Sequence, residues 1–359
     1  MNVWHRKATN RSMLLFNHTM LLLVLGDAFR TGGRTGGTPC NLSKTSIEGQ
    51  REATATHVHN LVNPMRENGA TVSVLLIINR CPRETAHFQN DVQRTLLSWY
   101  NEMKVDSVES KLVNSPHMEY GWRIAHAYAR RFMRANGKYD FLLQVRHDVA
   151  LERPIDQWPG DLSRLSFERA CFDCGGSCQC NSYEELQYHS LNRKCEICHA
   201  DHILWVPNKY IDTVQRAIIL RGAAGHDLLS NILVHEPKAL PIEDVGFLFP
   251  QECEMFPIDI NCGEIGAYRP LRINRETGNL PPKASDSESW EKWEEYYGVR
   301  VHKTTENKIR WQNQVDKLRL TPEATLTPGN VVKRLVDNLS YNRIRHKRRV
   351  NFSTAVPTP

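Results

Sequence analysis

The residues with the clearest capacity for chemistry lie in one short segment, Arg146-His147-Asp148. They directly follow the apolar run Tyr139–Val145, whose length and composition predict a strand buried on both faces of a sheet. In open α/β sheets, polar side chains at the carboxyl end of a central strand face the crevice in which such folds bind ligands. A carboxylate there can hold a divalent cation that bridges two phosphates, and an adjacent arginine can neutralise a diphosphate directly. A simpler interpretation stays open, namely an ion pair between Arg146 and Asp148 that only ends the strand.

The sequence before this segment predicts the elements that would position it. Thr71–Asn79 is a β-branched apolar run, which predicts a buried strand, and we expect it to be the first strand of the domain. Apolar residues recur at three- and four-residue steps over Glu84–Lys104 and Met118–Ala135, as in amphipathic helices, and Val105–Val113 predicts a weaker strand between them. Strands that alternate with helices indicate an α/β fold with a mostly parallel sheet.

Two stretches carry a resemblance to a known group of proteins. Tyr139-Asp-Phe-Leu-Leu-Gln-Val-Arg-His-Asp148, followed by Pro154-Ile155, resembles a strand-end motif of glycosyltransferase-like proteins with the GT-A nucleotide-sugar fold, with Arg-x-Asp in place of Asp-x-Asp. Asp201–Pro207 and the helix predicted over 208–221 are similar to a later part of the same group. The resemblance implies a GT-A-like (Rossmann-like), mixed and mostly parallel sheet flanked by helices over residues 68–280. It also implies transfer of a sugar from a nucleotide-sugar to a glycan, protein or lipid acceptor.

The resemblance assigns roles to residues of the predicted crevice. Asp148 would contact a divalent cation, Mn²⁺ or Mg²⁺, or the diphosphate itself, and Arg146 would neutralise the diphosphate charge. Asn79 and Arg80 would contact the nucleotide, because the carboxyl end of their strand borders the same crevice. Since Arg146 stands at the first acidic position of the motif, catalysis without a metal stays open. An inverting transfer also needs a general base, for which Glu243-Asp244 is our candidate, although a solvated turn is the simpler interpretation.

A cysteine-rich insert interrupts the domain over residues 168–200. The pairs Cys171/Cys174 and Cys195/Cys198 have the spacing of two thiolate pairs that close a tetrahedral zinc site. In an oxidising compartment the same cysteines would instead form disulfides that hold a loop without its own core. Structural zinc, disulfides and a redox-active thiol all stay open, and a zinc-stabilised interaction module is an alternative function.

The amino terminus predicts entry into the secretory pathway. A basic start precedes the apolar stretch Met13–Gly26, so residues 1–28 read as a signal peptide or signal-anchor, with a buried amphipathic helix as the alternative. Residues 29–67 are rich in Gly, Thr, Ser and Asn and predict an exposed stem. A Golgi or ER lumen, or secretion, would follow, with membrane association if the segment is retained. Ten cysteines and glycosylation acceptors fit this compartment; the acceptors outside the signal are Asn41, Asn338 and Asn351.

Composition excludes several classes of protein. With 40% hydrophobic and 24% charged residues, the chain is neither collagenous nor disordered as a whole. The net charge of +6 comes from the termini, and the body is slightly acidic, which argues against binding to nucleic acid. Residues 281–359 predict a helical extension with a solvated basic tail. The motifs of serine hydrolases, P-loop kinases, dinucleotide oxidoreductases and zinc proteases do not occur. A secreted binding protein that keeps the fold without chemistry stays an alternative.

Overall fold

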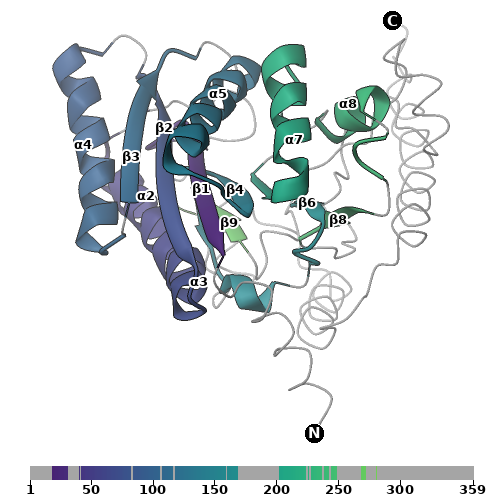
Figure 1. The fold of residues 1–359 in the computed structure, drawn as a ribbon. Coiled ribbons are helices and arrows are strands. Elements are labelled where there is room, and N and C mark those ends of the chain that lie inside the picture. Colours follow the sequence, from purple (N-terminus) through teal and green to yellow (C-terminus); the bar gives the residue numbers. More distant parts are fainter. Residues whose placement is uncertain are drawn as a thin grey trace, which may run out of the picture.

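The structure, a computed structural model, describes residues 18–30, 40, 42–81, 84–105, 107–115, 118–158, 160–168, 202–223, 225, 228–236, 238–241, 244–248, 268–271 and 280. Within these ranges the strands form a seven-stranded sheet in the order β3-β2-β1-β4-β7-β6-β8 and a two-stranded sheet of β5 and β9 (Figure 1). The cysteine-rich insert and the C-terminal extension predicted from the sequence lie outside the described residues.

Four parallel strands form one half of the large sheet, with β3 at its edge. β1 (Thr19–Gly26) pairs in parallel with β2 (Thr71–Asn79) on one side and with β4 (Phe141–Arg146) on the other, and β2 pairs in parallel with β3 (Ser107–Val113). All four strands therefore end at the same edge of the sheet. The apolar composition of β1, β2 and β4 suits strands that are covered on both faces.

The other half of the sheet is mixed. β7 (Ile203–Pro207) runs antiparallel to β4 and to β6 (Leu165–Phe167), and β6 is parallel to β8 (Val245–Phe247). β5 (Val149–Leu151), which follows β4, pairs antiparallel with β9 (Tyr268–Pro270). The predicted α/β fold class, a mixed and mostly parallel sheet flanked by helices, is confirmed.

Helices cover both faces of the large sheet, and alternate residues of β1 point into two separate cores. Met20, Leu22 and Val24 pack in one core with the π-turn at 58–62, α3 and α4. Leu21 and Leu23 pack in the other with α5, α7 and α8. Figure 1 shows the two helical layers on either side of the strands. The helices are α2 (Lys44–His57), a π-turn (Val58–Val62), α3 (Asn63–Glu67), α4 (Ala86–Glu102), α5 (Met118–Asn136), a 3-10 turn (Ile155–Gln157), α7 (Asn208–Arg221) and α8 (Leu228–His235).

The segment predicted as a signal peptide or signal-anchor contains the central strand of the fold. Met20 to Leu25 are at most 3% exposed, and burial of each such side chain stabilises the fold by about 1.5–3 kcal/mol. The expectation of a signal over residues 1–28 is corrected for its described part, residues 18–28, because a short apolar run has the same composition whether it is a leader or a strand buried on both faces. Among the described residues, no helix is long and apolar enough to cross a membrane.

The predicted stem over residues 29–67 is also corrected. Most of its described residues belong to α2, the π-turn and α3. The π-turn and α3 pack in the first core, and Ala53 of α2 packs with Ala150 and Leu271 in a smaller cluster. Ser43 caps α2, with its Oγ accepting the N–H of Ser46 at 3.3 Å. The folded domain thus includes β1 and does not begin at residue 68, and β2, predicted as the first strand, is the second. Polar composition concealed this helix because its buried face uses small and polar side chains, among them Gln50, Thr54 and His57.

The remaining elements follow the sequence-based expectations closely. The predicted strands and helices over 71–145 correspond to β2, α4, β3, α5 and β4, with shifts of a few residues at their ends. The strand and helix predicted around 201–221 correspond to β7 and α7.

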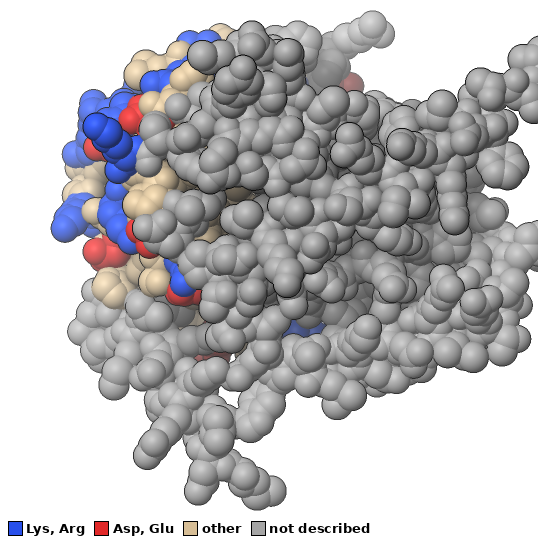
Figure 2. Space-filling model, turned by 90° about the vertical axis from the view of Figure 1, so that its right-hand side faces the viewer, with Lys and Arg blue, Asp and Glu red and all other residues tan. Residues whose placement is uncertain are grey.

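On the described part of the face in Figure 2, basic and acidic side chains are interspersed.

Candidate functional site

The strand order reverses between β1 and β4. From β1 the chain builds β2 and β3 on one side and then returns to place β4 on the other side of β1. In open α/β sheets, such a reversal opens a crevice outside the carboxyl ends of the strands, where ligands bind. Three loops meet at this edge and are called here the switch-point loops: Asp27–Arg30 after β1, Asn79–Cys81 after β2 and Arg146–Asp148 after β4.

A buried carboxylate joins two arginines from different switch-point loops. Arg146 Nε donates to Asp148 Oδ1 at 2.9 Å and Arg146 Nη2 donates to Oδ2 at 2.7 Å, which is a bidentate pair. Arg30 Nη1, from the loop after β1, lies 3.9 Å from Asp148 Oδ2. The Asp148 side chain is 2% exposed, whereas those of Arg146 and Arg30 are 12% and 18% exposed. The carboxylate therefore lies beneath two guanidinium groups that reach the surface.

Backbone contacts fix the turn that carries Arg146 and Asp148. The N–H of Arg146 donates to the carbonyl of His202 on the neighbouring strand at 3.1 Å, and the carbonyl of Asp148 accepts the N–H of Leu271 at 2.6 Å. His147, between them, turns inward and donates from Nε2 to the carbonyl of Ile77 at 3.2 Å. Burial lowers the pKa of His147 to about 4, so the ring is neutral at physiological pH and acts as a structural anchor.

The loop after β1 is held in an uncommon backbone conformation. Phe29 has a φ of 53°, in the left-handed region that is costly for a bulky residue, yet its side chain is 2% exposed and packs edge-on against Trp99. Gln50 of α2 stabilises this turn, because its Oε1 accepts the N–H of Phe29 at 2.9 Å. Its Nε2 donates to the carbonyl of His147 at 2.7 Å. One side chain thus links the loops after β1 and β4.

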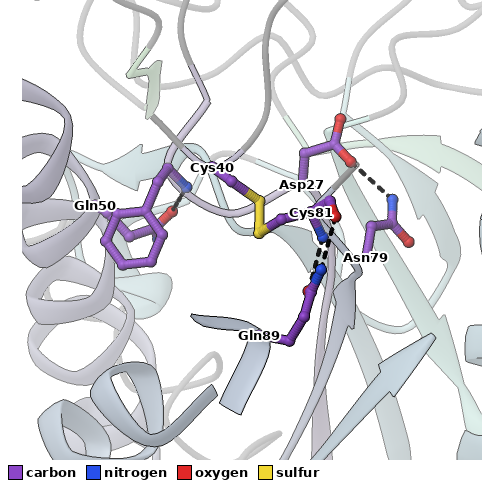
Figure 3. The surroundings of a disulfide bond; sticks show 7 residues. Asp27, Cys40, Gln50, Asn79, Cys81 and Gln89 are labelled. Carbon is purple, nitrogen blue, oxygen red and sulfur yellow. Dashed lines mark hydrogen bonds between the residues drawn. A yellow bond between two sulfur atoms is a disulfide. The ribbon is translucent and has the colours of Figure 1, made fainter. Parts of the chain in front are cut away.

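The loop after β2 is fastened to the loop after β1 by two contacts (Figure 3). Asn79 Nδ2 donates to Asp27 Oδ1 at 2.9 Å, and a disulfide joins Cys81 to Cys40. Gln89 of α4 holds Cys81 in place, accepting its N–H at 2.8 Å and donating to its carbonyl at 2.6 Å. The site therefore has a preorganised backbone on two sides.

The start of α5 closes the site beside Asn79. A Cβ placed on Gly121 would lie 2.8 Å from Ser115 Oγ and 3.6 Å from Asn79 Oδ1, so glycine allows this close approach. Because α5 follows β3, its N-terminus lies at the same edge as the switch-point loops. The partial positive charge of a helix N-terminus favours anions.

A buried acid–imidazole pair lies one strand away. The backbone N–H of His202, just before β7, donates to Glu168 Oε2 at 2.9 Å, and its Nδ1 donates to the same oxygen at 3.0 Å. The Glu168 side chain is fully buried. The pair lies beside the backbone of Arg146, to which His202 contributes its carbonyl.

The structure separates the candidate base from this edge. Asp244 precedes β8 and accepts from Lys209 Nζ at 2.9 Å and from the hydroxyl of Tyr210. Lys209 and Tyr210 lie at the start of α7, directly after Pro207. Pro207 pairs with Phe141 at the amino end of β4, so Asp244 lies at the opposite edge of the sheet from Asp148. The Lys209 hydrogen bond lowers the pKa of Asp244, which suits a surface ion pair. The geometry does not bring Asp244 into the site.

Of the other predicted site residues, Asn79 and Arg80 lie at the site, and the rest lie outside the described residues. Asn79 lies in the site, as described above, and Arg80 is exposed beside it, with its N–H donating to the carbonyl of Val113 at 2.8 Å. Several candidates lie outside the described residues, namely Glu243, Cys171, Cys174, Cys195 and Cys198.

Sequence reasoning missed Asp27, Arg30 and Gln50. Asp27 and Arg30 fell within the segments assigned to a leader and a stem, although Asp27 directly follows an apolar run just as Asp148 does. For Gln50, nothing in the sequence marks a contact with the loops after β1 and β4, which lie 21 and 97 residues away.

The donor set around Asp148 does not fit a divalent cation. Both carboxylate oxygens accept hydrogen bonds from Arg146, and the second positive charge of Arg30 lies within 4 Å. Mn²⁺ or Mg²⁺ requires several oxygen ligands and would meet two like charges here. Within the part of the chain that the structure describes, no group of three or more His, Cys, Asp or Glu is arranged to hold a metal ion.

Comparisons with known proteins find a distant likeness among solved structures. No protein-family model matches this chain, and no curated protein matches its sequence. Among solved structures, the apo form of mouse xyloside xylosyltransferase 1 is similar with a TM-score of 0.30 and 9% sequence identity, over 62% of this chain and 83% of that chain.

Proposed function

We propose that this chain binds a nucleotide-sugar at the switch-point loops and transfers its sugar to an acceptor. The observation that carries the proposal is the pair of guanidinium groups, Arg146 and Arg30, held by Asp148 at the point where the strand order reverses. Paired arginines match the geometry and charge of phosphate oxygens. Stabilising the diphosphate as it departs is the main electrostatic requirement of such a transfer.

Different polar groups at this edge would contact different parts of the nucleotide-sugar. Arg146 and Arg30 would contact the diphosphate, which is the leaving group. Asn79, Arg80 and Asp27, at the ends of β1 and β2, would contact the nucleoside, with the start of α5 beside them. The acceptor, a glycan, protein or lipid, would approach the same crevice from the solvent side.

A secretory-pathway lumen is the compartment that we propose. The Cys40–Cys81 disulfide supports it, because disulfides persist in oxidising compartments and are rare in the cytosol. Golgi and ER lumen are both compatible with this argument, as is secretion.

A second candidate is a binding protein with the same ligand and no transfer. The observation in its favour is the bidentate pairing of Asp148, which engages the carboxylate that was expected to contact a divalent cation or the diphosphate. This protein would hold the nucleotide-sugar through the same arginines and release it unchanged.

A thermal-shift screen of the full chain against nucleotide-sugars tests the proposal. We expect one donor to raise the melting temperature in a saturable way, since a ligand that binds only the folded state stabilises it. No stabilisation by any common nucleotide-sugar would contradict the proposal. Release of the nucleoside diphosphate with an acceptor mixture then separates transfer from binding alone.

A further inference from the structure

We infer that the diphosphate site works without a divalent cation: Arg146 and Arg30 supply the positive charge, and Asp148 positions both guanidinium groups instead of ligating a metal. This inference rests on the proposed nucleotide-sugar function and specifies how the same site recognises its ligand. It reassigns Asp148 and adds Arg30, which comes from a different loop.

The geometry of the pair supports a positioning role. The two oxygens of Asp148 accept from Nε and Nη2 of Arg146, which fixes the plane of that guanidinium. Because Asp148 is nearly inaccessible while both arginines reach the surface, an incoming diphosphate would meet the guanidinium groups and not the carboxylate.

The charges around Asp148 lead to the same conclusion. Arg146 and Arg30 each place a positive charge within 4 Å of Asp148 Oδ2, and a divalent cation ligated by this carboxylate would meet both of them. Ligation of a metal by Asp148 would also compete with its two charge-assisted hydrogen bonds to Arg146.

The surroundings of Arg30 explain how it is held opposite Arg146. The turn that precedes it is fixed by Gln50, which also holds the loop after β4. Ala28 accepts the N–H of Cys40 at 3.1 Å, and the disulfide anchors Cys40 to the end of β2. Preorganised donors reduce the cost of ordering when the ligand binds.

Titration calorimetry with ADP, GDP, UDP and CDP, in EDTA and in MnCl₂, tests the inference on the full chain. We expect at least one of these nucleoside diphosphates to bind. Its dissociation constants in the two buffers should agree within about threefold, which is a difference in binding free energy below 1 kcal/mol. Binding that requires Mn²⁺ would overturn the cation-independent mechanism and leave the proposed function standing. Failure of all four diphosphates to bind in either buffer would overturn both.

Variants identify which groups supply the charge. We expect R30Q and R146Q each to weaken diphosphate binding at least about tenfold in EDTA, and R146K to recover only part of the loss, because lysine cannot pair bidentately. R94Q is the matched control, since Arg94 lies on α4 and its side chain is 69% exposed. Unchanged binding in R30Q or R146Q would contradict the inference.

Asp148 requires a test that separates positioning from ligation. D148N should weaken binding equally in EDTA and in MnCl₂, whereas the loss of a metal ligand would abolish only the gain from Mn²⁺. R146Q leaves a buried carboxylate with a lost partner, which destabilises strongly. The double variant R146Q/D148N removes both charges, so it should fold and still fail to bind the diphosphate. Wild-type affinity in this double variant would refute the role of Arg146.

Discussion

At the scale of residues, the site depends on contacts between positions far apart in the chain. The sequence indicated Arg146 and Asp148, because they directly follow a buried strand, and the structure places them in contact. It could not indicate Arg30 as the second cation or Gln50 as the link, since only the fold brings these residues together. Metal ligation by Asp148 stays a prediction from the sequence, because a carboxylate beside an arginine suits a cation or an ion pair equally well, and the structure shows it paired with Arg146.

Gln50→Leu tests whether one buried side chain organises two of the loops. The change leaves the N–H of Phe29 and the carbonyl of His147 without their present partner, so we expect a loss of about 2–4 kcal/mol of stability. Nucleotide-sugar affinity should fall at least about tenfold. Urea unfolding and calorimetry measure the two effects. Gln93→Leu on α4 is the control, because the Gln93 side chain donates to the carbonyl and the hydroxyl of Ser110, which are partly exposed. Equal effects of the two changes would contradict the role of Gln50.

At the scale of elements, hydrophobic periodicity predicted β2, α4, β3, α5 and β4 with small errors at their ends. It assigned β1 wrongly, because its six consecutive apolar residues, Met20–Leu25, fit a leader as well as a strand, and only the pairing of β1 with β2 and β4 distinguishes them. It missed α2, whose buried side is largely polar. The disulfide between the loops after β1 and β2 could not be predicted either, because ten cysteines allow many pairings.

Removing that disulfide should affect both stability and binding. Cys40 and Cys81 are 41 residues apart, and closing a loop of this length stabilises a fold by about 4 kcal/mol in the chain-entropy account. We expect C40S/C81S to unfold at lower urea concentration and to bind the nucleotide-sugar more weakly, because Arg30 is less well held. Thiol reductant should reproduce both effects in the wild type and change neither in the variant. Equal binding by both proteins would show that the disulfide does not organise the site.

At the scale of the whole molecule, three described histidines are buried inside the fold in addition to His202, which pairs with Glu168. His57, the last residue of α2, bonds Tyr100 and Val149, His126 bonds Gln144, and His147 bonds Ile77. Burial lowers the pKa of each to about 4 from an ordinary value of 6.5. Between these values the unfolded chain binds more protons than the folded one, so stability falls as the pH decreases through this window.

Acid should therefore destabilise the protein well above the range in which carboxylates titrate. Proton uptake by each of these histidines on unfolding should lower the free energy of unfolding by roughly 2 kcal/mol between pH 7 and pH 5, with little change above pH 7. Urea unfolding at several pH values measures the slope, which H126Q should reduce. His87 is the control, because its side chain is 83% exposed and H87Q should leave the slope unchanged. A stability that stays flat from pH 7 to pH 5 would show that these rings do not take up protons on unfolding.

The most direct test of the nucleotide-sugar site is a calorimetric comparison of the wild type with R30Q/R146Q, using the donor found by thermal shift. One saturable site is expected in the wild type, with affinity at least about a hundredfold weaker in the double variant, while R94Q matches the wild type. Equal affinity in the double variant and the wild type would mean that the sugar donor, if it binds, does so away from the arginines that Asp148 holds.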